Sequence, residues 1–250
     1  MKTYPKWLSA AVLSAMLASP AAALETKAKN VILMDYDTGE YLFAENAFVP
    51  VAPASMSKLM TVYVLFSKLK DGTLSLEDVF SVSENAWRTG GAASGSSTMF
   101  LPIGSKVTVE NLIKGIIIQS GNDACIVAAE NIAGSEEDFA ELMNAKAKEL
   151  GLKNSHFVNS TGLPHPDHRM SAEDLARLAQ ALIRDFPEYY SVFSQKSFTY
   201  NNILQGNRNP LLYSMPDADG LKTGHTAEAG FCLTASVKRG DRRLIGVMTG

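Results

Sequence analysis

The sequence predicts a mixed α/β fold of the α+β type, in which an antiparallel sheet joins the two chain ends and helices pack on it. Segments 31–44 and 197–248 have β-type content, whereas segments 55–70 and 109–184 carry apolar runs of helical length. With 250 residues, 46% of them hydrophobic, the chain is long enough to bury one sizeable core or two small ones.

Composition and charge exclude several classes of protein. The 23 Lys and Arg residues oppose 26 Asp and Glu residues, which gives a net charge of −3. A nucleic-acid binder usually has a strong basic excess, so no nucleic-acid partner is expected. The 18 Gly and 10 Pro residues are ordinary numbers for a globular chain, which excludes disordered and collagen-like proteins.

Residues 1–23 have the pattern of a secretory signal peptide. Two lysines begin the segment, an apolar run at 8–18 is too short to span a bilayer, and three alanines at 21–23 suit signal peptidase. A buried N-terminal helix is the alternative, but Pro20 ends the run and no helix cap begins it. We therefore predict an extracytoplasmic protein with a single domain at 24–250 and no further membrane span.

The first elements expected after the signal are a hairpin and a central helix. Residues 31–34 and 40–44 flank Asp-Tyr-Asp-Thr-Gly, which is a turn sequence. Pro50 and Pro53 then exclude a strand, and residues 55–70 are predicted to form a helix. Apolar residues cover most of the circumference of this helix, so we expect it at the centre of the domain.

Three further helices are expected beyond a loop at 83–105. An apolar helix at 109–119 is interrupted by Ser-Gly-Asn and resumes at 123–133. Two Ser-x-x-Asp patterns then resemble capping boxes: Ser135 with Asp138 and Ser171 with Asp174. They predict helices that end near residues 150 and 184, separated by a long loop at 152–170, and loops of this length are usually functional.

The C-terminal part is predicted to form strands. They are expected at 197–201, 220–224, 229–238 and 242–248, with a hairpin turn at 239–241. Two cysteines, Cys125 and Cys232, lie in apolar runs. Buried free thiols are the favoured interpretation, although an extracytoplasmic location also permits a disulfide between them.

The first chemical motif is Ser55-Met56-Ser57-Lys58, an S-x-x-K sequence at the start of the predicted central helix. Residues i and i+3 share a helix face, so the Lys58 amine can reach the Ser55 hydroxyl, take its proton and create a nucleophile. A second S-x-x-K, at 67–70, lies at the polar end of the same helix and is assigned to the solvated surface.

The second and third motifs are Ser120-Gly121-Asn122 and Lys222-Thr223-Gly224. A hydroxyl can pass a proton and an amide can hold a peptide carbonyl, whereas a lysine and a threonine can bind a substrate carboxylate. Each motif is weak alone. Ser and Asn also suit a turn or a helix N-cap, the S-x-N pattern recurs at 83–85, and a K-T-G can be an ordinary strand end.

The order of the motifs is more specific than any one of them. Ser55 and Ser120 lie 65 residues apart, and Lys222 follows 102 residues later. S-x-x-K, S-x-N and K-T-G in this order are the signature set of penicillin-binding proteins and serine β-lactamases. From about residue 30 to residue 250 the chain resembles the low-molecular-mass penicillin-binding D-alanyl-D-alanine carboxypeptidases, most closely in these stretches: 52–58, 119–125, 151–157 and 220–226.

This resemblance implies a β-lactamase/transpeptidase-like domain, with a five-stranded antiparallel sheet and helices on both faces. It implies a periplasmic enzyme that removes the terminal D-alanine from peptidoglycan pentapeptides and that β-lactams inhibit covalently, with no metal or organic cofactor. It also implies that the chain stops before the end of its domain. Attachment to the outer face of the cytoplasmic membrane would then depend on a region beyond residue 250.

The resemblance also implies roles for residues that match the motifs. Ser55 would attack the carbonyl between the two D-alanines, with Lys58 as the base of acylation. Backbone N–H groups of Ser55 and His225 would form the oxyanion hole. Ser120 would relay a proton to the departing D-alanine, and Asn122 would orient Lys58 and the substrate amide.

The remaining expected roles concern the terminal carboxylate of the substrate. Lys222 would supply positive charge, and Thr223 and Arg208 would bind the carboxylate. Gly224 would let the ligand backbone approach the strand edge closely. Arg208 lies in an Asn-Arg-Asn sequence that could equally form an exposed turn.

Four other functions compete with this prediction. A β-lactamase would need an efficient base for deacylation, but no clear glutamate motif lies in 152–170, and Ser-Gly-Asn replaces Ser-Asp-Asn. A D,D-endopeptidase would share the motifs, whereas a catalytically silent wall-binding scaffold should have broken them. A zinc peptidase could use these residues of the long loop, although no H-E-x-x-H spacing is present: His156, His165, Asp167 and His168.

Overall fold

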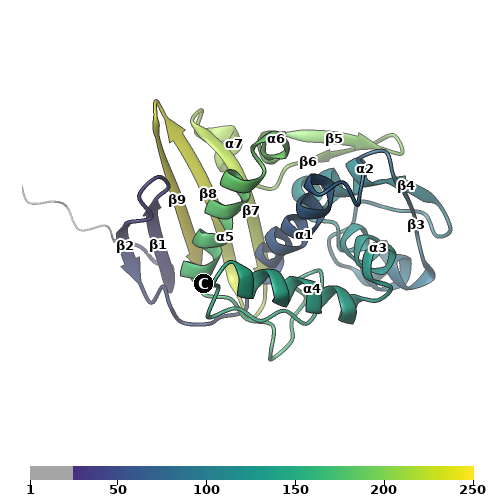
Figure 1. Ribbon diagram of the computed structural model, residues 1–250, viewed down its shortest axis with the longest axis horizontal. Helices are drawn as coiled ribbons and strands as arrows, with labels where there is room; N and C mark the ends of the chain where they lie inside the picture. The colour runs from purple at the N-terminus through teal and green to yellow at the C-terminus, as the bar shows by residue number, and fades with distance from the viewer. Residues whose placement is uncertain (1–24) are drawn as a thin grey trace, which may run out of the picture.

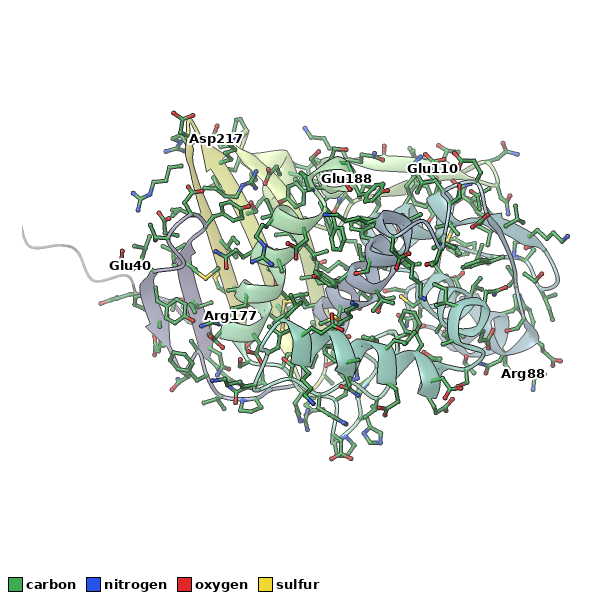
Figure 2. The ribbon with its side chains drawn as sticks, in the orientation of Figure 1. Glu40, Arg88, Glu110, Arg177, Glu188 and Asp217 are labelled. Carbon is green, nitrogen blue, oxygen red and sulfur yellow. The ribbon has the colours of Figure 1, made fainter. Side chains whose placement is uncertain are left out.

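The computed structural model describes residues 25–250, so the predicted signal peptide lies outside the described residues. Figure 1 shows a twisted sheet at one side of the molecule and a mainly helical part at the other. The predicted mixed architecture is confirmed. Charged side chains such as Arg88, Glu110 and Asp217 lie at the margin of both parts in Figure 2, whereas buried apolar side chains form one continuous core.

The sheet has five strands in the order β2-β1-β9-β8-β7, and all neighbours are antiparallel. Its strands are β1 (Asn30–Asp35), β2 (Tyr41–Glu45), β7 (Ala218–Thr226), β8 (Gly230–Arg239) and β9 (Arg242–Thr249). Strand β1 pairs with β9 over its whole length, from Asn30 opposite Thr249 to Asp35 opposite Leu244. The expectation that the sheet joins the two ends of the chain is therefore confirmed.

The central helix is α1 (Lys58–Lys70), and it is preceded by a short 3₁₀ turn, η1 (Ala54–Ser57). Buried side chains include Met60, Leu65 and Phe66, each with at most 1% exposure, as predicted for a helix that is apolar nearly all round. Ser55 thus lies in a tight 3₁₀ turn and not in the first turn of the α-helix. Tight turns of this kind are common at helix N-termini.

The other long helices surround α1 and the sheet. They are α2 (Val109–Lys114), continued by the wider turn η4 (Gly115–Gln119), α3 (Asn122–Ala133), α4 (Glu136–Glu149) and α5 (Ala172–Asp185). The N-cap half of each predicted capping box forms, because Ser135 Oγ accepts from Asp138 N and Ser171 Oγ accepts from Asp174 N, each at 3.0 Å. Helix α5 packs against β9, β1 and β8, and α4 packs against α1 and α3 (Figure 1).

Two small antiparallel ribbons complete the fold. One pairs β3 (Val79–Ser81) with β4 (Lys106–Thr108), and the other pairs β5 (Ser197–Tyr200) with β6 (Ile203–Gly206). Short turns fill the connections: η2 (Ala86–Gly90), η3 (Ala92–Ser94), α6 (Pro187–Tyr190), η5 (Ser191–Ser194) and α7 (Leu211–Ser214). Strands β3, β4 and β6 were not predicted, because three or four residues are too few to show a period, whereas β5, equally short, was predicted from its β-type content. Within residues 25–250, none of the helices has the length and apolar character needed to cross a membrane.

Candidate active site

A cavity of about 810 Å³ lies where η1, the start of α3, the edge strand β7 and the loop at 152–170 meet. It brings together parts of all three motifs, which lie far apart in the sequence. The predicted residues that line it are Ser55, Ser120, Asn122, Arg208, Thr223, Gly224 and His225. Lys58 and Lys222 lie beneath this lining, with 0% and 2% exposure.

Lys58 Nζ is the centre of the site. It lies 2.9 Å from Ser55 Oγ, 2.7 Å from Asn122 Oδ1 and 2.5 Å from the carbonyl oxygen of Thr161. Carbonyl oxygens accept only, so a neutral amine donates its two N–H groups to Asn122 and Thr161. Its lone pair is then left for the Ser55 hydroxyl, which is the arrangement needed to remove a proton from Ser55.

The charge state of Lys58 supports this arrangement. Burial lowers the pKa of Lys58 from 10.5 to about 8, because a desolvated ammonium group is unfavourable. The Arg208 guanidinium lowers it further, whereas Cys125, Glu136 and Asp123 oppose the shift. Burial, followed by repulsion from Lys58 and Arg208, holds the pKa of Lys222 well below its usual value.

Ser120 occupies the break between η4 and α3 with φ = 64°, in the left-handed region that non-glycine residues rarely adopt. Its side chain is buried, and its hydroxyl has no hydrogen-bond partner among the residues that the structure describes. Strained residues of this kind are concentrated at functional sites. The unpaired hydroxyl is buried at the edge of the cavity, which makes Ser120 a candidate functional residue.

Asn122 is fixed from two sides. Its Oδ1 accepts from Lys58 Nζ, and its Nδ2 donates to Ser96 Oγ at 2.9 Å. Its backbone N–H also donates to the carbonyl oxygen of Ser97 at 2.7 Å. The loop that contains Ser96 and Ser97 therefore forms one wall of the cavity and orients the amide.

The K-T-G motif lies on the edge strand β7, directly against η1. A Cβ atom at Gly224 would lie 3.1 Å from the Pro53 carbonyl oxygen and 3.2 Å from Ser55 N, so this contact favours a residue without a side chain. Gly224 was expected to give a ligand room; in the structure, its missing side chain lets β7 pack closely against η1. Lys222 Nζ donates to the Thr223 carbonyl oxygen at 3.0 Å and makes no hydrogen bond with Ser120 Oγ within residues 25–250.

Arg208 reaches the site from the loop between β6 and α7. Its Nη1 donates to Ser97 Oγ at 2.6 Å, and its side chain lines the cavity. The flanking residues Asn207 and Asn209 are buried and hold the turn through side-chain hydrogen bonds. Arg208 itself is exposed, so it lies in an exposed turn whose side chain also lines the cavity. His225 is exposed and stacks on Phe231, with ring centroids 4.3 Å apart.

Two contributors to the site were not predicted. The Thr161 carbonyl comes from the long loop, and only the length of that loop indicated a function. Asp123 follows the S-x-N motif, and its buried carboxylate accepts from Thr98 Oγ1 and from the backbone N–H groups of Met99, Leu101 and Ala124. It thereby ties the wall containing Ser96 and Ser97 to the start of α3, and a lone Asp in a sequence gives no sign of this.

Within residues 25–250, the side chains of the two cysteines and of the histidines of the long loop make no hydrogen bond with the motif residues. Cys125 and Cys232 are both buried free thiols, so the favoured interpretation is confirmed. In the long loop, His156 Nδ1 contacts the Asp167 carbonyl oxygen, and His168 is buried with its pKa lowered to about 4 by burial. Across residues 25–250, no three or more His, Cys, Asp or Glu side chains are grouped so that they could hold a metal ion.

Comparison with known proteins identifies the chain. A family model described as D-alanyl-D-alanine carboxypeptidase, peptidase S11, matches residues 16–250. The chain belongs to this family. It is 50% identical to the D-alanyl-D-alanine carboxypeptidase DacC of Escherichia coli over 221 residues, which cover 88% of this chain and 55% of that protein. The chain therefore spans about half the length of the curated family members it matches first.

Solved structures of the family confirm the fold. Penicillin-binding protein 5 from Haemophilus influenzae superposes with a TM-score of 0.88 at 41% identity, covering 91% of this chain and 66% of that one. Penicillin-binding protein 6B from Escherichia coli gives a TM-score of 0.86 at 45% identity, covering 91% and 72%. The predicted β-lactamase/transpeptidase-like class, with its five-stranded antiparallel sheet, is thus the fold of this family member.

Proposed function

We propose that the chain is a serine-type D-alanyl-D-alanine carboxypeptidase that removes the terminal D-alanine from peptidoglycan pentapeptides. The observation that carries the proposal is the 2.9 Å contact between Lys58 Nζ and Ser55 Oγ at the floor of an open cavity. The lowered pKa of Lys58, about 8, makes it a general base near neutral pH. Family membership supplies the substrate class.

Acylation begins when Ser55 Oγ attacks the carbonyl between the two D-alanines and Lys58 takes the hydroxyl proton. The oxyanion is held by the backbone N–H groups of Ser55 and His225, and each such donor contributes about 3 kcal/mol. The close approach of β7 to η1 at Gly224 supports this pairing, because it brings the two backbone segments together. Ser120 relays the proton that Lys58 took from Ser55 to the nitrogen of the departing D-alanine as the C–N bond breaks.

Binding and deacylation complete the cycle. Thr223 and Arg208 hold the terminal carboxylate of the substrate. Lys222, buried beneath them, adds positive potential when its amine is protonated, and a bound carboxylate favours that form. Asn122 holds Lys58 through its Oδ1 and orients the substrate amide. Water then hydrolyses the Ser55 ester and releases the shortened peptide. A β-lactam presents a similar carbonyl and acylates Ser55 covalently. No metal or organic cofactor takes part in these steps.

The first experiment is labelling with a fluorescent penicillin. The wild type should become covalently labelled and Ser55→Ala should not, whereas equal labelling of the two proteins would refute the mechanism. Release of D-alanine from a pentapeptide then tests the reaction itself. Parallel kinetics with a cross-linked muropeptide and with hydrolysis of penicillin separate a D,D-endopeptidase and a β-lactamase from the carboxypeptidase.

We also infer where the protein acts. Residues 1–23 are a signal peptide, residues 24–250 are the D,D-peptidase domain, and the mature protein lies in the periplasm at the outer face of the cytoplasmic membrane. The basic start, the apolar run and the alanines of the first 23 residues support export. Mass spectrometry of the exported protein tests this, because cleavage after Ala23 predicts Leu24 as the new N-terminus.

A further inference from the structure

The Thr161 carbonyl on Lys58 belongs to a loop that is held from two sides. The residue before it, Ser160, is fully buried. Ser160 donates to Glu136 Oε1 twice, from its backbone N–H at 3.1 Å and from its hydroxyl at 2.5 Å. Its carbonyl oxygen accepts from Thr61 Oγ1 at 2.6 Å. Every polar group of Ser160 is therefore paired, and its position is set by α4 and α1.

Thr61 lies one helical turn after Lys58, so both residues project from the same face of α1 toward this loop. Lys58 contacts the Thr161 carbonyl, and Thr61 contacts the preceding carbonyl. A shift of Ser160 therefore moves the acceptor that holds one N–H group of Lys58. If that acceptor is lost, the amine can rotate its lone pair away from Ser55.

Glu136 holds the opposite side of Ser160. It is the first residue of α4, where the helix dipole favours a carboxylate, and its side chain is half-buried. Its negative charge also acts on Lys58 directly, because it favours the ammonium form and thus opposes the effect of burial on the pKa. Among the described residues, the other charged or titratable groups that interact with Lys58 are Cys125, Arg208, Asp123, Lys222 and His168.

From these contacts, we propose that Glu136 is a positioning residue for Lys58: it holds Ser160 so that the Thr161 carbonyl stays on Nζ and the amine faces Ser55. This proposal rests on the proposed function and adds a residue that touches neither substrate nor nucleophile. None of the three sequence motifs includes Glu136.

The test compares Glu136→Ala, Glu136→Gln and the matched control Glu137→Ala, which changes the next, exposed residue of the same first turn. The rate of Ser55 acylation by a fluorescent penicillin is measured against pH, beside the thermal midpoint. Glu136→Ala should acylate between about tenfold and a hundredfold more slowly, as misplaced catalytic groups do. The control should match the wild type.

Glu136→Gln separates positioning from plain stability. Its amide oxygen can still accept from Ser160, so its highest acylation rate should lie within about threefold of the wild type. The acylation rate of this variant should begin to rise at a lower pH than that of the wild type, because the negative charge that favours the ammonium form of Lys58 is gone. A wild-type rate in Glu136→Ala, or equally slow rates in both variants with the pH of this rise unmoved, would overturn the proposal.

Two further measurements keep the test decisive. If Glu136→Ala does not fold, Thr61→Val removes the opposite hydrogen bond without changing charge, and Thr61→Ser should restore the rate. A wild-type rate in Thr61→Val would then overturn the proposal. The ¹³Cε signal of Lys58 in lysine-labelled protein reports its titration without any substrate. If penicillin fails to label even the wild type, the proposed function is wrong, while a Lys58 signal that keeps its position and its titration in Glu136→Ala overturns this inference separately.

Discussion

The rate of Ser55 acylation should follow the ionisation of Lys58. Only the free amine can take the hydroxyl proton, and burial sets the pKa of Lys58 at about 8. The free-base fraction is then roughly 1% at about pH 6, roughly 10% at about pH 7 and roughly 90% at about pH 9. The acylation rate should therefore rise about ninetyfold across this range and level off above it, in contrast to an exposed lysine, which would still be rising.

The assay measures the second-order rate constant of labelling by a fluorescent penicillin, in buffered solutions of constant ionic strength. Lys222 is the second buried amine at the site and also has a lowered pKa, so it needs a control. Lys222→Arg keeps a positive charge that does not titrate in this range. The rise of the acylation rate near pH 8 should remain in this variant even if the overall rate falls.

Two results would refute this reasoning. A flat profile over the same range would show that the proton on Lys58 does not control acylation. A rise that disappears in Lys222→Arg would assign the titration to Lys222, and Lys58 would lose its role as the base.

Three other perturbations have definite expected results. Asp123→Ala leaves a buried hydroxyl and several backbone N–H groups without an acceptor, so urea unfolding should show a loss of about 3 kcal/mol or more. Gly162→Ala places a Cβ atom 2.0 Å from the Ala54 carbonyl oxygen at φ = +79°, so it should lower both the thermal midpoint and the acylation rate. Cys125 and Cys232 are free, so a reducing agent should leave the thermal midpoint unchanged.

Each of these expectations has its own control. Gly151→Ala has a similar positive φ with no atom within 4 Å of the new Cβ, so it isolates backbone strain from the collision at Gly162. If both variants acylate at the same rate, the collision is irrelevant to the site. Asp123→Asn keeps one acceptor oxygen and should lose less stability than Asp123→Ala; equal losses would contradict the account of Asp123. A midpoint that falls on reduction would contradict the free thiols.

Local signals in the sequence determined most of the fold. The N-caps Ser135 and Ser171 begin helices where predicted, because a short side chain that accepts from the N–H three residues later is a local interaction. The apolar circumference of α1 predicted its burial for a similar reason, since a side chain's face follows from its position along the helix. The S-x-x-K contact is equally local, and Lys58 lies 2.9 Å from Ser55 as its spacing indicates.

Other features depended on the tertiary structure. The Thr161 carbonyl reaches Lys58 across 103 residues, and Arg208 reaches Ser97 across 111. Backbone carbonyls carry no sequence signature, and the path of a loop has no period from which such contacts could be predicted.

What the sequence by itself determined about this protein is the set of reactive groups, their order along the chain and the helices and strands that carry them. Only the tertiary structure decided how those groups are tuned. Burial lowers the pKa of Lys58, and Glu136 accepts a hydrogen bond from Ser160. Both features arise only when separate segments of the chain pack together. The physical reason is that desolvation and hydrogen-bond geometry depend on all neighbours in space, whereas a motif records only neighbours along the chain.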